Sequence, residues 1–592
     1  MSRLNRKLFR DLRFNLSQFI VIFVMVMVGV LAFAGVHAYM DGMRVSGEQY
    51  YQKYNLADLW LSGENFTEQD LQDVKVMDNI RNAERKLTLT SSLKGHGDVT
   101  LETNFIETNE INRFHVKEGE DFDPEKDGVW FDSALAENLD IQTGDTIRFR
   151  LMGQTFERKI LGLIDAPDHV YSIKDETEIF PSHKDFGFIY LSSRQIPGDI
   201  QIFNSMMVDV KDRANIDATR KALTDSITSA IAVTGRDSLT SYMGYQNEIE
   251  EGETYSIVFS FLFLFIAALS VVTTMNRFVR RQRTQIGTLK ALGFRRGRIV
   301  RHYVSYGFWV SLIAAAIGIV IGDLTIGKFF LNMEMSYFIV SDYHTVLEPE
   351  VFLMAGAVVI GITFITWMST RSILRVPAAE SLRVERPKVK NTGFRFTTKG
   401  PFSRASLPVK WNLRDIGRNK GRSIMAIAGI MGCTMLVVCA MGMMDTINSY
   451  ISLEYGGLNN FKYKVVLNTD YTEENYSQLT AAYGNATSET LPVSIDYPDG
   501  NKQDDNVVTV SDGGEKIRFI DHNRNYITLE NHGVYLTEKL AKKLGVGKGD
   551  SITWKIMGTD RKYTTEIAGL NRDPQNQQMT MTRASFEELG ET

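Results

Sequence analysis

The side chains able to do chemistry are few and scattered in this sequence. The nucleotide-binding pattern G-x-x-x-x-G-K-S/T does not occur, and its nearest imitation, GVGKG at residues 545–549, lacks the final hydroxyl. His37, His302 and His344 lack metal-ligand spacing, and the acidic run 118–127 is expected to be a solvated loop rather than a calcium site. No nucleophile, base and orienting group stand out together. We therefore predict no catalytic, cofactor or metal site in the chain, and any ATP and Mg²⁺ would be bound by a separate protein.

The most informative short segment lies in the basic stretch 277–301, which contains no acidic residue. Ile286, Leu289 and Leu292 follow helical spacing, and Gly293 suits the end of a helix. These features predict a short amphipathic helix at 284–293 that docks in a groove of a partner. Taken one by one, the arginines around it suit a topology signal or contact with lipid headgroups equally well. The candidate docking residues are Gln285, Ile286, Gly287, Thr288, Leu289, Lys290, Ala291, Leu292 and Gly293.

Five apolar stretches must position this segment. They run over Phe19 to Tyr39, Tyr255 to Met275, Tyr303 to Ile326, Val351 to Met368 and Ser423 to Met444. Each approaches the length of about 20 residues that crosses a bilayer as a helix. None carries a charge near its middle, and Asp323 is the nearest exception. The glycine pairs Gly318/Gly322 and Gly429/Gly432 are predicted to let these helices pack closely.

The first stretch also has the features of a signal peptide, because arginines precede it and Ala32-Phe33-Ala34 resembles a cleavage site. Its apolar region is too long, and a copy of it recurs in mid-chain. We therefore expect it to remain as a membrane span. The basic stretches place the N-terminus, 277–301 and 371–422 in the cytoplasm. Residues 41–253, with about 40 acidic and about 22 basic side chains, then lie outside.

Only two cysteines occur, Cys433 and Cys439, and both lie in the fifth apolar stretch. Disulfides are thereby excluded from the outer regions, which must be held together by hydrophobic cores.

An internal repeat links the two halves of the chain. At an offset of 404 residues, Arg10-Asp11 falls on Arg414-Asp415 and Met40-Asp41 on Met444-Asp445, so the first span corresponds to the fifth. With small shifts the match continues from 128–163 onto 533–570. In this shared segment a helix containing Leu135 and Leu139 is predicted, followed by a Gly-Asp turn and a half-buried strand with Ile147, Phe149 and Leu151.

We predict an α-helical membrane protein with α+β extracytoplasmic domains, made from a duplicated unit of one span, one outer domain and three spans. The second unit is incomplete, and we expect that the sequence is a fragment with three further spans beyond Thr592. The expected division is a basic cytoplasmic N-terminus 1–18, a span 19–40, an outer domain 41–253, a three-span domain 254–376, a basic cytoplasmic linker 377–422, a span 423–444 and an incomplete outer domain 445–592.

Three motifs resemble those of the FtsX-like (MacB-type) ABC transporter permeases. They are RTQIGTLKALGF at 283–294, PAAESLR at 377–383 and RNKGRS at 418–423. Gln285 stands where the family usually has an acid, so the sequence departs from the family pattern at this position and offers no negative charge there. The two units resemble those of long members in which one chain is similar to a fused dimer of permease units.

The resemblance implies a MacB-like periplasmic core domain after the first span and a helix at 284–293 that contacts an ABC ATPase, which would itself be a dimer. The expected function is that of a permease subunit in the bacterial plasma membrane, multi-pass with a cytoplasmic N-terminus. It would couple ATP hydrolysis by its partner to movement of the outer domains, and so to export or extraction of a lipid, lipoprotein, peptide or antibiotic. An extracytoplasmic client or accessory protein is a further expected partner, and nucleic acid is not. The alternative is a signalling or regulatory scaffold that senses or activates an extracytoplasmic partner.

Overall fold

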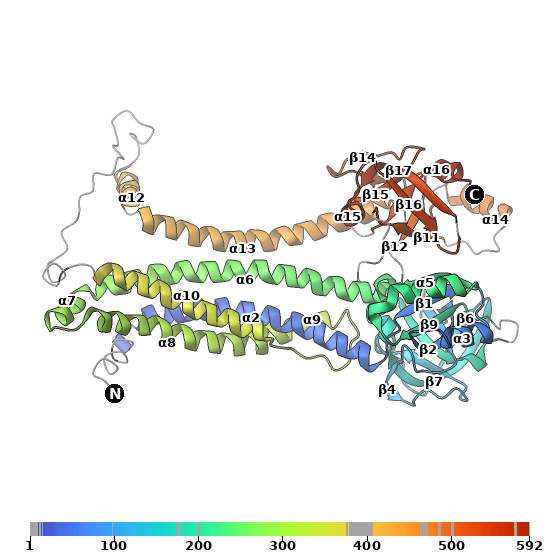
Figure 1. Ribbon diagram of the computed structural model, residues 1–592, viewed down its shortest axis with the longest axis horizontal. Helices are drawn as coiled ribbons and strands as arrows, with labels where there is room; N and C mark the ends of the chain where they lie inside the picture. Colours follow the sequence, from blue (N-terminus) through green and yellow to red (C-terminus); the bar gives the residue numbers. More distant parts are fainter. Residues whose placement is uncertain are drawn as a thin grey trace. The chain divides into compact units, whose positions relative to one another are not determined.

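The chain forms two compact units in the computed structural model (Figure 1). The structure describes residues 10, 13–14, 16–97, 99–174, 178, 180–197, 202–374, 377, 406–418, 420–461, 464–465, 472–483, 487–498, 503–559, 561–573 and 577–590. The membrane unit comprises 1–49, 247–336 and 341–441, and the outer unit comprises 50–246, 337–340 and 442–592. Most of the predicted linker 377–422, including the PAAESLR motif after its first residue, lies outside the described residues.

Long apolar helices account for the membrane unit. They are α2 (Leu16–Lys53), α6 (Thr240–Arg281), α8 (Arg296–Gly322), α10 (Pro349–Leu374) and α13 (Lys420–Leu453), with the shorter α7 (Arg283–Ala291), the π-helical turn η5 (Asp323–Gly327), α9 (Lys328–Glu334) and α12 (Leu407–Arg418). Five helical segments in the described part of the chain are long and apolar enough to cross a membrane. Four of them contain the first four predicted apolar stretches, and the fifth, Ile427–Leu458, overlaps the stretch predicted at Ser423 to Met444. The crossing itself remains a prediction.

Four of these helices, α2, α6, α8 and α10, pack around one apolar core (Figure 1). Phe19 of α2 stacks on Tyr306 of α8 with ring centroids 5.4 Å apart and meets Phe278 of α6 edge-on at 4.8 Å. Val351 and Ile362 of α10 are buried in the same core. Large apolar side chains at helical spacing on every helix therefore hold the bundle together.

The outer unit begins with a ten-stranded sheet. Its strands are β1 (Leu59–Gly63), β2 (Ile80–Leu93), β3 (Thr100–Ile106), β4 (His115–Gly119), β5 (Val129–Asp132), β6 (Thr146–Leu151), β7 (Gln154–Asp165), β8 (Phe186–Ser192), β9 (Ser205–Val210) and β10 (Ala230–Gly235). The helices α3 (Glu68–Lys75), α4 (Ser133–Leu139) and α5 (Ile216–Ser226) accompany it. The strand order is β10-β1-β9-β2-β3-β8-β5-β7-β4, and β6 joins β7 back to β2. The α+β architecture predicted for this region is confirmed.

The predicted helix, turn and strand of the shared segment are found in place. Leu135 is buried on α4, and Gly144 adopts the left-handed φ of 96° that suits glycine in the following turn. Ile147, Phe149 and Leu151 are buried on β6 while the residues between them are exposed. The period of two in the sequence therefore placed one face of this strand correctly.

A second, smaller domain of the outer unit is a closed six-stranded barrel of order β11-β12-β18-β15-β17-β16. Its elements are α14 (Glu473–Tyr483), β11 (Glu489–Asp496), β12 (Gln503–Val510), β13 (Phe519–Ile520), β14 (Tyr526–Ile527), β15 (Val534–Thr537), α15 (Glu538–Leu544), β16 (Ser551–Ile556), β17 (Lys562–Asn571), β18 (Met579–Met581) and α16 (Arg583–Glu588). The strands β2-β3-β8-β5-β7-β6 of the first sheet close the same ring with the same parallel and antiparallel pairings.

The turns after α4 and α15 correspond atom by atom. Asp145 accepts the amide of Gln142 at 2.8 Å, and Asp550 accepts the amide of Gly547 at 2.8 Å. Each short helix ends on a left-handed residue, Asp140 in the first domain and Gly545 in the second.

Candidate coupling helix and outer pocket

The predicted docking segment forms α7 between α6 and α8. The helix ends at Ala291, and Gly293 takes the left-handed φ of 81° that a glycine adopts without strain. The amide of Gly293 donates to the carbonyl of Lys290 at 3.0 Å, and the amide of Phe294 donates to that of Leu289 at 3.1 Å. This pair of bonds is the Schellman arrangement, which ends a helix and turns the chain sharply. The sequence therefore predicted the end of α7 correctly.

The apolar face of α7 points into the membrane unit. Ile286 is buried in the core of the bundle with no exposed surface, Gly287 is also buried, and Leu289 and Phe294 pack against the same core. The prediction that Ile286 and Leu289 dock on a partner is therefore wrong. Because α6 and α8 are joined to α7 by very short connections, they hold its apolar face against their own core.

The opposite face of α7 is free of such packing. Thr284, Gln285, Thr288, Ala291 and Leu292 are exposed, and Leu292 keeps 69% of its surface accessible. This face is mostly polar and uncharged. Basic side chains border this face. The pKa of Lys290 is lowered, mainly by its partial burial and to a smaller extent by the nearby positive charge of Arg296. A partner that docks here would meet hydroxyl, amide and methyl groups surrounded by positive charge.

The glycines of α8 allow α2 to approach closely. A Cβ on Gly318 would stand 2.8 Å from the carbonyl oxygen of Met27, and one on Gly322 would stand 2.6 Å from that of Leu31. Gly35 of α2 faces Gly322 in return, since a Cβ added to Gly35 would stand 2.8 Å from the carbonyl oxygen of Gly322. Real Cβ atoms do not approach backbone oxygens so closely, so these helices need glycine at all three positions.

The glycines of α13 differ from each other. A Cβ on Gly432 would lie 2.8 Å from Ile266 of α6, whereas one on Gly429 would meet no atom within 4 Å. Gly432 therefore packs against another described helix, as predicted, whereas Gly429 contacts none of the other described helices.

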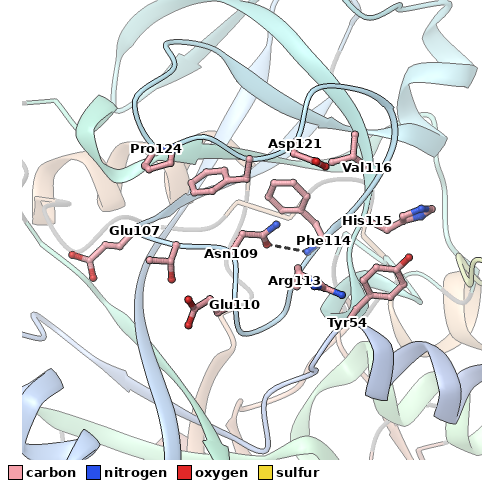
Figure 2. Close-up of a pocket in the computed structure, with 12 residues that line it drawn as sticks. Tyr54, Glu107, Asn109, Glu110, Arg113, Phe114, His115, Val116, Asp121 and Pro124 are labelled. Carbon is pink, nitrogen blue, oxygen red and sulfur yellow. Dashed lines mark hydrogen bonds between the residues drawn. The ribbon is translucent and has the colours of Figure 1, made fainter.

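A pocket of about 500 Å³ opens in the outer unit where the chain leaves α2 (Figure 2). It is lined by Tyr54, Glu107, Thr108, Asn109, Glu110, Arg113, Phe114, His115, Val116, Asp121, Phe122 and Pro124. Phe114 is nearly fully buried and meets Phe122 edge-on at 5.9 Å, while the side chain of Asn109 fixes the loop by accepting the amide of Phe114 at 3.1 Å. Arg113 lies over the ring of Tyr54. Aromatic walls beside acids and a cation suit an amphiphilic ligand.

A buried cluster of charges crosses the first outer sheet. His169 contacts Glu102 through Nε2 at 3.0 Å and Asp168 through Nδ1 at 3.1 Å. Asp168 also accepts Lys86 at 3.4 Å and Tyr190 at 3.1 Å. These residues come from β2, β3, β8 and the 3₁₀ turn η1 (Pro167–His169), so the cluster ties separate elements together.

The members of this cluster stabilise one another's charges. Burial lowers the pKa of His169, but the carboxylates of Glu102 and Asp168 outweigh it and raise that pKa to about 10. Burial raises the pKa of Glu102, but the charge of His169 and its hydrogen bond bring it down to about 2. The pKa of Asp168 is lowered in the same way. All three are charged at neutral pH, so opposite charges on separate elements of the sheet compensate one another.

Two family models match the chain. The model described as FtsX-like permease C-terminal matches residues 257–376, which contain α7, and the MacB-like periplasmic core domain matches residues 20–226. Together they account for more than half of the sequence. The chain belongs to the FtsX-like, MacB-type ABC permease family. Members of this family are membrane subunits that are not themselves catalytic, and the several apolar helices of this permease agree with that class.

Solved structures of outer domains resemble parts of this permease. The extracellular domain of the noncanonic ABC-type transporter YknZ from Gram-positive bacteria is 15% identical, with 31% of this chain and 99% of that chain covered and a TM-score of 0.23. The periplasmic region of MacB from Actinobacillus actinomycetemcomitans is 11% identical, with 34% and 95% covered and a TM-score of 0.22. No curated protein sequence matches the chain.

Several features of this permease were not predicted from the sequence. Gly35 directly follows Ala34, and two adjacent small residues in an apolar stretch were the signal for a packing position. The buried cluster had no such signal, because Glu102 and His169 lie 67 residues apart and meet only through the sheet. The outer pocket likewise depends on how the loop after β3 folds over Tyr54.

Proposed function

We propose that this permease couples ATP hydrolysis by a separate ABC ATPase to movement of its outer domains, and thereby exports or extracts a lipid, lipoprotein, peptide or antibiotic. The ATPase, a dimer, binds the ATP and Mg²⁺. The exposed face of α7, defined by Thr284, Gln285, Thr288, Ala291 and Leu292, receives it. On this account α7 lies in the cytoplasm, as the basic residues 277–301 indicate.

The anchoring of α7 is the observation that supports this proposal best. Its two faces have separate tasks, because Ile286 and Leu289 fasten it to the bundle while Thr288 and Leu292 remain accessible. The Schellman turn at Gly293 then connects α7 directly to α8. A push on the exposed face is thus delivered to α6 and α8 rather than lost in a loose loop.

Two continuous helices offer the route from the spans to the outer unit. α2 runs unbroken from Leu16 to Lys53 and α6 from Thr240 to Arg281, and each contributes residues to both units. In the outer unit Tyr51 from α2 and Tyr245 from α6 are buried, with their rings edge-on at 6.2 Å. Packed aromatic side chains hold the ends of both helices in the outer unit. A displacement of the helices would therefore be transmitted to the sheet.

We place contact with the transported molecule at the outer pocket of Tyr54, Phe114 and Phe122. Its apolar walls and charged rim suit an amphiphile, which is the chemistry common to the proposed substrates. We also infer that the chain repeats one structural unit. The identical ring of pairings in the two outer domains and the matching turns at Asp145 and Asp550 support this inference.

The test uses the full chain in lipid nanodiscs with its ATPase. Thr288→Asp places a charge on the exposed face of α7, and Thr155→Asp makes the same change on an exposed position of β7. We expect Thr288→Asp to abolish binding and stimulation of the ATPase, and Thr155→Asp to leave both unchanged. Equal ATPase stimulation by the two variants would remove α7 from the coupling site. Stimulation and outer-domain movement without any transport would favour a regulatory scaffold.

A further inference from the structure

A groove lies between the start of α8 and the end of α10 in the membrane unit. It has a volume of about 570 Å³. Its lining includes Arg296, Val300, Arg301 and Val304 from α8 and Trp367 and Arg371 from α10. The groove therefore has a cationic mouth and an apolar wall.

Among the described residues, no carboxylate pairs with the three arginines of the mouth. Within the described part of the chain, none of Arg296, Arg301 and Arg371 forms an ion pair, and all three are exposed. α8 contains no acidic residue, and the only one in α10, Glu350, is at its opposite end. The guanidinium of Arg371 lies 5.0 Å from the ring centre of Trp367, which holds it beside the groove. A mouth of this kind is suited to a phosphate group, which guanidinium groups bind with paired hydrogen bonds.

The apolar wall continues away from the mouth along both helices. On α8, Val300 and Val304 are followed at the same spacing by Phe308, and on α10 Trp367 is preceded by Phe364 and Ile360. Phe308, Phe364 and Ile360 are 38%, 58% and 71% exposed. These side chains stand where the hydrocarbon of a bilayer would cover them, on helices long enough to cross it.

The two helices that line the groove make a tight contact beside it. A Cβ on Gly307 of α8 would collide with the side chain of Thr366 of α10, so the two helices touch there without room for adjustment. Phe308 and Trp367 are the next residues on each helix. The close contact thus fixes the spacing between the apolar walls, which a preformed ligand site requires.

We propose that this groove binds one anionic phospholipid, with the phosphate between Arg296, Arg301 and Arg371 and an acyl chain along Val304, Phe308 and Phe364. Free phosphate would use the mouth alone, whereas a phospholipid uses the mouth and the apolar wall together. Tryptophan beside the arginines suits the headgroup level of a membrane. Since Arg296 begins the helix that directly follows α7, a bound lipid also steadies the α7–α8 turn.

The lipid assignment is tested by native mass spectrometry of the full chain released from micelles that contain phosphatidylglycerol or phosphatidylcholine. The wild type is expected to retain one phosphatidylglycerol in preference to phosphatidylcholine. The double variant R301Q/R371Q is expected to lose that preference, at about fivefold in affinity for each arginine. R298Q is the matched control, because Arg298 lies on the same turn of α8, is exposed and does not line the groove. Equal loss in R298Q would indicate diffuse charge attraction and overturn the site.

Two further arms separate lipid from free phosphate and from misfolding. Val304→Phe fills the groove without changing the charge, and we expect it to lower phosphatidylglycerol retention while the protein stays monodisperse in size-exclusion chromatography. Unchanged retention in this variant would contradict a site that uses the apolar wall. Excess inorganic phosphate is expected to leave the lipid in place, and complete displacement by phosphate would assign the mouth to a small anion. Lipid retention does not depend on the ATPase, so these results are independent of the proposed function.

Discussion

Replacing His169 by alanine removes the central cation of the buried cluster in the first outer sheet. His169 contacts Glu102 at 3.0 Å and Asp168 at 3.1 Å, and the Asp168 side chain is only 2% exposed. In the variant, Asp168 keeps Lys86 as its one ion-pair partner, and Glu102 loses the one ion pair that it forms among the described residues. Removing one partner of a buried ion pair costs about 3–5 kcal/mol, because the remaining charge is left uncompensated.

The raised pKa of His169 reflects the same contacts with Glu102 and Asp168. A rise from 6.5 to about 10 corresponds to about 4–5 kcal/mol of preferential stabilisation of the charged form. Because the folded pKa is the higher one, this contribution is complete below pH 6.5 and is lost as the pH rises through 10. Glu102 acts in the opposite sense, since its folded pKa is about 2, so its contribution is complete above its usual pKa and is lost as the pH falls toward 2.

Hydrogen–deuterium exchange of the full chain measures this cost locally, which suits a protein whose units need not unfold together. At pH 6 the amides of β3 and β8 should exchange at least a hundredfold faster in His169→Ala than in the wild type. The difference should shrink as the pH approaches 10, after correction for the intrinsic exchange rate. His96→Ala, at an exposed position of the same domain, is the control. Equal protection in the two variants would refute a stabilising role for the cluster.

Three further predictions concern single positions. Leu289→Asp should prevent a folded membrane unit because Leu289 packs on its core, whereas Leu292→Asp should fold and fail only to stimulate the ATPase; size-exclusion chromatography and ATPase assays distinguish the two. Gly322→Val should lower the melting temperature in detergent, at a cost of about 1–3 kcal/mol from overpacking against α2, while Gly361→Val, where no atom lies within 4 Å, should not. Burial raises the pKa of Asp132 to about 7, so ionisation of this carboxyl destabilises the fold as the pH rises from 4 to 7. Asp132→Asn should therefore slow hydrogen exchange in the first outer sheet at pH 8 and have little effect on it at pH 4.

Local sequence patterns predicted much of the fold. The alternation of Ile147, Phe149 and Leu151 predicted the buried face of β6, and Gly293 predicted the end of α7, because both depend on the backbone and on nearest neighbours alone. The five apolar stretches likewise predicted helices, since length and composition determine them.

The sequence pattern did not predict which surface covers the apolar face of α7. Periodicity shows that Ile286 and Leu289 share a face, but it does not show whether a partner or the chain itself covers that face. The cover is supplied by α6 and α8, and only the tertiary structure reveals it. The buried cluster and the groove at Arg301 and Arg371 were unpredictable for the same reason, because each joins residues that are far apart in sequence.

In the proposed mechanism, a push on the exposed face of α7 moves the outer domains. The most direct measurement is hydrogen–deuterium exchange of the outer pocket loop, residues 107–116, in nanodiscs that contain the permease and its ATPase, with and without ATP and Mg²⁺. We predict that ATP changes exchange in this loop in the wild type and that Leu292→Asp removes the change while exchange in the absence of ATP stays the same. An ATP-dependent change that persists in Leu292→Asp, or no change in the wild type while ATP is being hydrolysed, would contradict coupling through α7.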